Sequence, residues 1–170
     1  MNLFPQYVEV KFFNRELINK LELYDVFINK KDWFYKTPGA LAFDLYAIVE
    51  EPVIIYPFHS TKIPMGLALQ LWNDDTLFGL IISIRSSVSL KGLSLTNGVG
   101  IIDADFQGEI HCSVENNNRN NYYTIEPGER IAQAMIVPTI QFNENSMKIV
   151  EEFSRPTIRN SSGFGTTGKF

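Results

Sequence analysis

The 170-residue chain has little of several features that mark particular classes of protein. Its one cysteine excludes an internal disulfide, and its two histidines are too few for a zinc site built from histidine and cysteine. No apolar run approaches the roughly 18 residues of a membrane span, and no basic segment followed by an apolar one opens the chain. The net charge is −4, and no basic stripe interleaved with aromatics occurs. We therefore expect a cytoplasmic protein that neither enters a membrane nor binds a nucleic acid polymer.

What the chain does have is a large share of hydrophobic residues, 45%, arranged with a period of two in short segments. That period places alternate side chains on one face, as in a strand, and proline, glycine and asparagine separate the segments. Candidate strands are Val8–Phe12, Phe43–Ile48, Val53–Tyr56, Leu67–Trp72, Phe78–Ile84, Ile110–Val114, Tyr122–Ile125, Ile131–Pro138 and Met147–Val150. So many short strands predict an all-β protein, a jelly-roll-like barrel or sandwich.

Three local features complete the predicted fold. Asn14 can cap a helix from Arg15 to Tyr24, and Asn116 to Asn121 are expected to form a hairpin loop. Cys112 alternates with polar neighbours and is expected to be a buried structural thiol rather than a nucleophile.

Residues able to bind an anion gather in the middle of the chain. Arg85, Ser86 and Ser87 follow an apolar strand directly, and a guanidinium beside two hydroxyls suits a phosphate. Residues 97–109 include a strand-like trio and three acids within seven residues, which could bind a metal, activate water or decorate a turn. Residues 128–133 form a turn entering a strand that carries a charge and an amide, and both need partners if they are buried.

The C-terminal residues 160–170 are rich in glycine and hydroxyl groups. Glycines let the backbone approach a ligand, and the hydroxyls and the preceding Arg159 add donors for phosphate oxygens. Taken alone, the segment equally fits a polar, disordered terminus. We predict one β domain over residues 1–153 and a flexible C-terminal arm over residues 154–170.

In their order and spacing, five segments resemble the five motifs of the trimeric dUTPase family, the deoxyuridine 5'-triphosphate nucleotidohydrolases. The matching segments are Ala42–Ala47, Arg85–Ser87, Asn97–Glu109, Gly128–Gln133 and Arg159–Gly168. The resemblance implies a homotrimer of jelly-roll subunits with shared active sites, which hydrolyses dUTP to dUMP and pyrophosphate with Mg²⁺. That reaction prevents uracil incorporation into DNA and supplies dUMP for thymidylate synthesis.

The resemblance also implies a role for each matching residue. Asp103 would orient and deprotonate the water that attacks the α-phosphorus. Asp44 would hold waters of the Mg²⁺ ion rather than the ion itself, which the triphosphate carries. The phosphate contacts and their catalytic supports would be Arg85, Ser86, Ser87, Arg130 and Gln133.

Base recognition is implied for Asn97 and the strand after it, including Gly100 and Ile102, whose backbone would offer uracil hydrogen bonds that cytosine cannot match. Phe106 stands where the family has tyrosine, and its ring would pack against deoxyribose so that a ribose 2′-hydroxyl clashes. In the arm, Phe164 would stack on the base. The arm residues that would close over the phosphates are Arg159, Ser161, Ser162, Gly165, Thr166 and Thr167.

The chain departs from the family pattern at a few places. Residues 14–36 are longer than usual before the first motif, which identifies them as an insertion. Substituted motif positions are Ala42, Ile84, Ser87, Asn160 and Ser162. None of these changes removes a functional group, although Ser87 and Ser162 could narrow the access of the backbone to phosphate.

Two alternatives stay open. The dCTP deaminases share the fold and the Arg-Ser-Ser motif, but they use a glutamate ten residues beyond the aspartate, where this chain has Ser113. Glu115 lies one strand pair further along, so hydrolysis is favoured over deamination. The second alternative is a nucleotide-gated regulator, for which residues 14–36 would be a docking surface for a protein partner.

Overall fold

The computed structural model describes residues 5, 7–30, 34–72, 76–140 and 144–155. The chain divides into two compact units, residues 1–140 and residues 141–170. The predicted boundary after residue 153 and the insertion at residues 14–36 stay predictions. Within the described ranges, no helix is long and apolar enough to cross a membrane.

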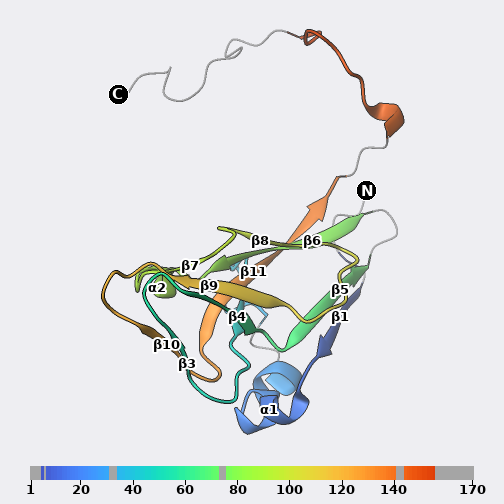
Figure 1. Ribbon diagram of the computed structural model, residues 1–170. Coiled ribbons are helices and arrows are strands. Elements are labelled where there is room, and N and C mark those ends of the chain that lie inside the picture. The colour runs from blue at the N-terminus through green and yellow to red at the C-terminus, as the bar shows by residue number, and fades with distance from the viewer. Residues whose placement is uncertain (1–4, 6, 31–33, 73–75, 141–143, 156–170) are drawn as a thin grey trace. The chain divides into compact units, whose positions relative to one another are not determined.

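The first unit is built from strands, with short helical segments between them (Figure 1). The strands are β1 (Tyr7–Phe12), β2 (Phe43–Tyr46), β3 (Val53–Ile55), β4 (Ser60–Pro64), β5 (Leu67–Trp72), β6 (Leu77–Ile84), β7 (Leu93–Leu95), β8 (Gly100–Ile102), β9 (His111–Asn116), β10 (Tyr123–Ile125) and β11 (Arg130–Thr139). The helical segments are α1 (Arg15–Lys20), the π-helix η1 (Asp25–Lys30) and α2 (Ser86–Ser89). The second unit contains the 3₁₀-helix η2 (Glu144–Ser146).

All strand pairs are antiparallel, and many join strands that are distant in the sequence. A four-stranded sheet has the order β2-β11-β6-β8, and a three-stranded sheet has the order β4-β9-β7. Two further pairs are β1-β5 and β10-β3. The predicted all-β, jelly-roll-like fold is confirmed, although the described strands do not close into a barrel.

The core follows from the alternation in these strands. In β9, Cys112 and Val114 are 2% and 0% exposed, whereas His111 is exposed. Phe43 of β2 and Leu80 of β6 are also buried. Burial raises the pKa of the Cys112 thiol to about 12, so the prediction of a buried, unreactive cysteine is confirmed.

The predicted helix is capped as expected but is shorter. Asn14 Oδ1 accepts a hydrogen bond from the N–H of Leu17 over 3.2 Å, and the helix ends at Lys20 rather than Tyr24. Glu22 has a φ of 57°, a left-handed conformation that breaks the helical path. The chain then continues as the π-helix η1, whose wide turns have no signature in the hydrophobic period.

Two other local predictions are wrong. Residues 116–121 are not a hairpin loop, because β9 pairs with β4 and β7 whereas β10 pairs with β3. Asn116 is instead the buried end of β9, and its Nδ2 donates to the carbonyl oxygens of Ile55 and Asn121, each over 2.9 Å. Residues 147–150 alternate in sequence but form no strand. Ile149 is 97% exposed, and alternation without a partner strand does not make a ladder.

Candidate functional site

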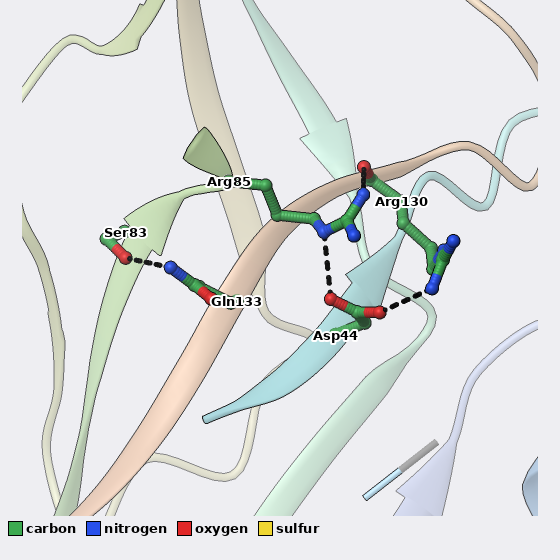
Figure 2. A network of polar contacts seen from close by, with 5 residues as sticks. All are labelled: Asp44, Ser83, Arg85, Arg130 and Gln133. Atoms are coloured by element: carbon green, nitrogen blue, oxygen red, sulfur yellow. Dashed lines mark hydrogen bonds and ion pairs between the residues drawn. The ribbon is translucent and has the colours of Figure 1, made fainter. Parts of the chain in front are cut away.

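One carboxylate lies between two guanidinium groups where β2, β6 and β11 meet (Figure 2). Asp44 is in β2, Arg85 directly follows β6, and Arg130 begins β11. Arg85 Nε lies 2.9 Å from Asp44 Oδ1, and Arg130 Nη1 lies 2.9 Å from Asp44 Oδ2. Arg85 Nη1 also donates to the carbonyl oxygen of Arg130 over 3.1 Å. We call these three residues the arginine cluster.

Strand register explains why these side chains meet. Because β11 pairs with β2 on one side and β6 on the other, Gln133 lies opposite both Asp44 and Ser83. Gln133 Nε2 donates to Ser83 Oγ over 3.3 Å. The expectation that Arg130 and Gln133 need partners is therefore met by Asp44 and Ser83. Arg130 itself is not buried, since its side chain is 43% exposed.

The charge of the arginine cluster suits an anion. Two guanidinium groups face one carboxylate, which leaves one positive charge in excess. Each guanidinium has five N–H donors, and the contacts above use two donors of Arg85 and one of Arg130. The Arg85 side chain is 26% exposed, so ligands can reach it from solvent. Planar donors with a net positive charge bind phosphate oxygens well.

The same cluster does not form a metal cage. Both oxygens of Asp44 face a guanidinium, which disfavours direct coordination of a cation by Asp44. Among the described residues, no three His, Cys, Asp or Glu side chains gather to hold a metal. Mg²⁺ keeps several waters and is often carried by phosphate groups. The residues present therefore fit a divalent cation that arrives with a phosphorylated ligand.

Ser86 and Ser87 lie beside the cluster, in the first turn of α2. Arg85 precedes them in an extended conformation, and Val88, 2% exposed, fixes the turn to the core. Both serines are exposed. The first N–H groups of a helix have no partner within it, so this turn adds donors next to the two arginines.

A separate hollow of about 170 Å³ lies beside the turn that joins β7 to β8. Its lining residues are Lys62, Ile82, Leu95, Thr96, Asn97, Gly100, Ile101, Ile102, His111, Cys112 and Ser113. Asn97, Gly100 and Ile102, which the sequence predicts to bind the base, are thus brought together. A Cβ atom at Gly100 would lie 3.2 Å from Ile82 Cβ, so glycine keeps this wall open.

Strand β8 is the free edge of the four-stranded sheet in the described part of the chain. It pairs with β6 through Gly100, Ile101 and Ile102, and its other side faces away from β6. An edge strand presents N–H and C=O groups in a fixed pattern that a planar ligand can match as a partner strand would. A nucleobase is such a ligand.

Asp103 follows β8 directly, at the end of the sheet opposite to Arg85. Ile102 pairs with Leu80, so Asp103 lies next to the level of Gly79, six residues before Arg85 along β6. At about 3.3 Å per residue, the two levels are about 20 Å apart. Asp103 is exposed, and its carbonyl oxygen accepts the N–H of Phe106 in a turn. Within one chain, therefore, the predicted water-activating carboxylate does not reach the arginine cluster.

Phe106 does not line the hollow beside β8. It lines a second hollow of about 270 Å³ formed with β1 and β5, and its ring packs over Gly108. The predicted deoxyribose contact of Phe106 stays a prediction. The arm residues Arg159, Ser161, Ser162, Phe164, Gly165, Thr166 and Thr167 lie outside the described residues.

Sequence reasoning missed three side chains that border the candidate base site. Lys62, His111 and Ser113 line the hollow beside β8, from strands β4 and β9. Strand β4 lacks the apolar alternation that would have predicted it from the sequence. Its Lys62 reaches the hollow because it pairs with Ser113 of β9.

The family comparisons agree with this geometry. The chain matches the model of the dUTPase family over residues 29–168. A deoxyuridine 5'-triphosphate nucleotidohydrolase from Aromatoleum aromaticum is 43% identical over 136 residues, which cover 79% of this chain and 87% of the relative. One from Francisella tularensis subsp. holarctica is 37% identical over 162 residues, which cover 95% of this chain and 98% of the relative.

Solved structures share the fold. The Staphylococcus bacteriophage 80alpha dUTPase with dUpNHpp has a TM-score of 0.71 and 22% identity, and the match covers 96% of this chain and 99% of that one. A variant of the dUTPase from phage phi11 of S. aureus, with a structural Mg(II) ion, has a TM-score of 0.65 and 19% identity and covers 88% of this chain and 100% of that one. The match to the family model over residues 29–168 includes all five motif-like segments. This chain belongs to the dUTPase family.

Proposed function

We propose that this protein hydrolyses dUTP to dUMP and pyrophosphate. The observation that carries the proposal is the presence of two features: a hollow beside an edge strand that Asp103 directly follows, and an arginine cluster with excess positive charge. The first suits a planar base and the second suits phosphates. Membership of the dUTPase family supports the choice of substrate.

In the proposed reaction, water attacks the α-phosphorus. The Asp103 carboxylate accepts a proton from that water while the new oxygen–phosphorus bond forms. The bond from the α-phosphorus to the bridging oxygen of the β-phosphate breaks, and pyrophosphate leaves. Arg85, Ser86 and Ser87 bind the phosphate oxygens whose charge grows in the transition state.

Asp44 and Gln133 support these contacts. Asp44 fixes the planes of both guanidinium groups, and Gln133, opposite Asp44 in the sheet, donates to Ser83 two residues before Arg85. Mg²⁺, when it is bound to the triphosphate, neutralises phosphate charge. Asp44 would contact the hydrated ion only through lone pairs that the arginines leave free.

Selectivity for uracil would come from fixed hydrogen bonds. The backbone of β8 and the Asn97 amide can match the donor and acceptor pattern of uracil, and cytosine has an amino group where uracil has a carbonyl oxygen. Buried groups left without partners make the mismatch costly. We further propose that Phe106 excludes a ribose 2′-hydroxyl and that Phe164, Arg159, Gly165, Thr166 and Thr167 close over the bound nucleotide.

One chain does not complete this site. About 20 Å of strand separates the level of Asp103 from Arg85, and a nucleoside triphosphate needs both at its α-phosphate. We propose a homotrimer in which one subunit supplies the hollow and Asp103, a second supplies the arginine cluster, and the arm closes over both. The single, buried and free Cys112 suits a cytoplasmic location.

The deaminase alternative gains no support from the geometry. Ser113 lines the hollow at the position where a deaminase would need its glutamate, and Glu115 is not among the lining residues. A second role as a nucleotide-gated binding protein stays a prediction.

The test is a panel of nucleotides. Purified protein is incubated with dUTP, dCTP, dTTP and UTP, with Mg²⁺ and with a chelator, while pyrophosphate and ammonia are measured. The proposal predicts pyrophosphate from dUTP alone and a large loss of rate with the chelator. Ammonia from dCTP, or equal rates with dUTP and UTP, would contradict it.

A further inference from the structure

Most of the helical segment of residues 14–30 precedes the match to the family model, which begins at residue 29. It is nevertheless part of the core. Leu17, Ile18, Leu23 and Phe27 are 5%, 2%, 9% and 4% exposed. Fully burying side chains of this size contributes on the order of 1.5–3 kcal/mol each, so the segment is firmly docked on the β domain.

Phe27 connects this segment to the strand that carries Asp44. Its ring meets the ring of Tyr46 edge to face, with centroids 5.2 Å apart and an interplanar angle of 83°. It also stacks on the ring of Phe12 in β1, with centroids 5.4 Å apart. Phe27 is therefore wedged between β1 and β2.

Tyr46 in turn neighbours the charged groups of the arginine cluster. It lies two residues after Asp44 in β2, so both side chains lie on the same face of the strand. Arg130 is its cross-strand partner in β11. Burial raises the pKa of Tyr46, and the charges of Arg130, Asp44 and Arg85 act on it more weakly.

Leu23 lies beside the turn that leads into Arg130. Its Cδ1 is 3.7 Å from the point where a Cβ at Gly128 would stand, and Gly128 has a φ of 76°. Gly128 N–H donates to the Ala47 carbonyl oxygen, and Ala47 N–H donates to the Glu129 carbonyl oxygen, each over 2.8 Å. The helical segment thus contacts the strand of Asp44 through Phe27 and lies beside the turn before Arg130 at Leu23.

We propose that Phe27 and Leu23 are positioning residues for phosphate binding: through Tyr46 and the Gly128 turn, they hold Asp44 and Arg130 in the geometry that orients Arg85. The proposal rests on the proposed function for its substrate. It gives Leu23 and Phe27 a role in the reaction although neither side chain belongs to the proposed nucleotide site.

The test compares two buried phenylalanines. Phe27→Leu keeps an apolar side chain but loses the ring edge against Tyr46, whereas Phe78→Leu changes a ring that is 1% exposed in β6, opposite Pro138 and distant from the cluster. An aromatic pair of this kind is worth enough to change an affinity by about fivefold. We expect Phe27→Leu to raise KM for dUTP about fivefold. Phe78→Leu should lower Tm by a similar amount as Phe27→Leu but leave KM unchanged.

Substitutions of Tyr46 provide a conservative control and, combined with Phe27→Leu, a double-mutant cycle. Tyr46→Phe keeps the ring and is expected to retain wild-type KM, while Tyr46→Leu is expected to resemble Phe27→Leu. The double variant Phe27→Leu/Tyr46→Leu should have a KM no higher than either single variant, because both substitutions remove the same ring contact. Wild-type KM in Phe27→Leu with a lowered Tm would overturn the proposal, since it would make the segment structural only.

A second readout separates this proposal from the proposed function. Calorimetric binding of inorganic tripolyphosphate reports on the arginine cluster without any hydrolysis. Weaker binding in Phe27→Leu but not in Phe78→Leu supports positioning even if the wild-type protein fails to hydrolyse dUTP. Equal binding in wild type and Phe27→Leu overturns positioning even if dUTP is hydrolysed.

Discussion

The ion pairs of Asp44 give the sharpest prediction about the site. In Asp44→Asn, the amide keeps one oxygen that can accept from one arginine, but it presents an NH₂ group to the other. One of the two charge-assisted contacts at 2.9 Å is therefore lost. Such contacts are worth about 1.5–3 kcal/mol each. Because the Arg130 side chain is 43% exposed and water can replace part of the loss, we expect a fall of roughly 2 kcal/mol in the free energy of unfolding.

This loss is measurable in two assays. For a chain of this length, roughly 2 kcal/mol corresponds to a decrease of about 4–8 °C in Tm, measured at one fixed protein concentration. The rate with dUTP should fall further, because a guanidinium displaced by about 1 Å can cost on the order of 100-fold in kcat/KM. Glu50→Gln is the matched control, since Glu50 is an exposed carboxylate, and it should change the unfolding free energy by less than about 0.5 kcal/mol. Wild-type Tm and wild-type kcat/KM in Asp44→Asn would refute the claim that this carboxylate organises the cluster.

Three further predictions concern other parts of the chain. Asp103→Asn should lower kcat for dUTP by on the order of 100- to 10,000-fold while nucleotide binding, measured by calorimetry, persists; a kcat near wild type would remove Asp103 from its role. Truncation after Phe153 should reduce kcat/KM severely and leave Tm nearly unchanged, because the fold of residues 1–140 has its own core; full activity in the truncated protein would contradict a closing arm. Cys112, whose pKa burial raises to about 12, stays protonated in the folded protein, whereas the unfolded thiol ionises near its ordinary pKa of 9.0. The stability that the protonated thiol contributes is therefore present below about pH 9 and is lost as the pH rises toward 12. Between pH 8 and pH 10.5, the denaturation midpoint of Cys112→Ala should therefore fall less than that of the wild type. Equal decreases in the two proteins would contradict this prediction.

Much of the fold was predictable because alternation in the strands is strong. Cys112 and Val114 alternate with polar neighbours, and both are buried as the pattern requires. Strand β4 has little apolar alternation and β7 is only three residues long, and both form because β9 offers each a partner. Asn116 shows the limit most clearly: its type favours a turn, but its amide is fully buried and bonds two distant carbonyl groups.

The sequence suggests which residue types form the site but not how they are arranged. Arg85, Arg130 and Gln133 were expected at the site, yet only the pairing of β11 with both β2 and β6 brings them to Asp44 and Ser83. The distance between Asp103 and the arginine cluster depends on the register of β6 with β8, which no local pattern encodes. The role of Phe27 beside Tyr46 depends in the same way on a long-range contact.

The central claim is that dUTP is hydrolysed at a site shared between copies of this chain, and mixed assemblies test it most directly. Asp103→Asn and Arg85→Gln are each expected to be inactive when they assemble alone. If the two variants are unfolded, mixed in equal amounts and refolded together, a site with Asp103 from one subunit and Arg85 from another is intact in about one quarter of cases. About one quarter of the wild-type rate of pyrophosphate release from dUTP should then return. No gain above the parent variants, in a preparation shown to contain mixed assemblies, would contradict it.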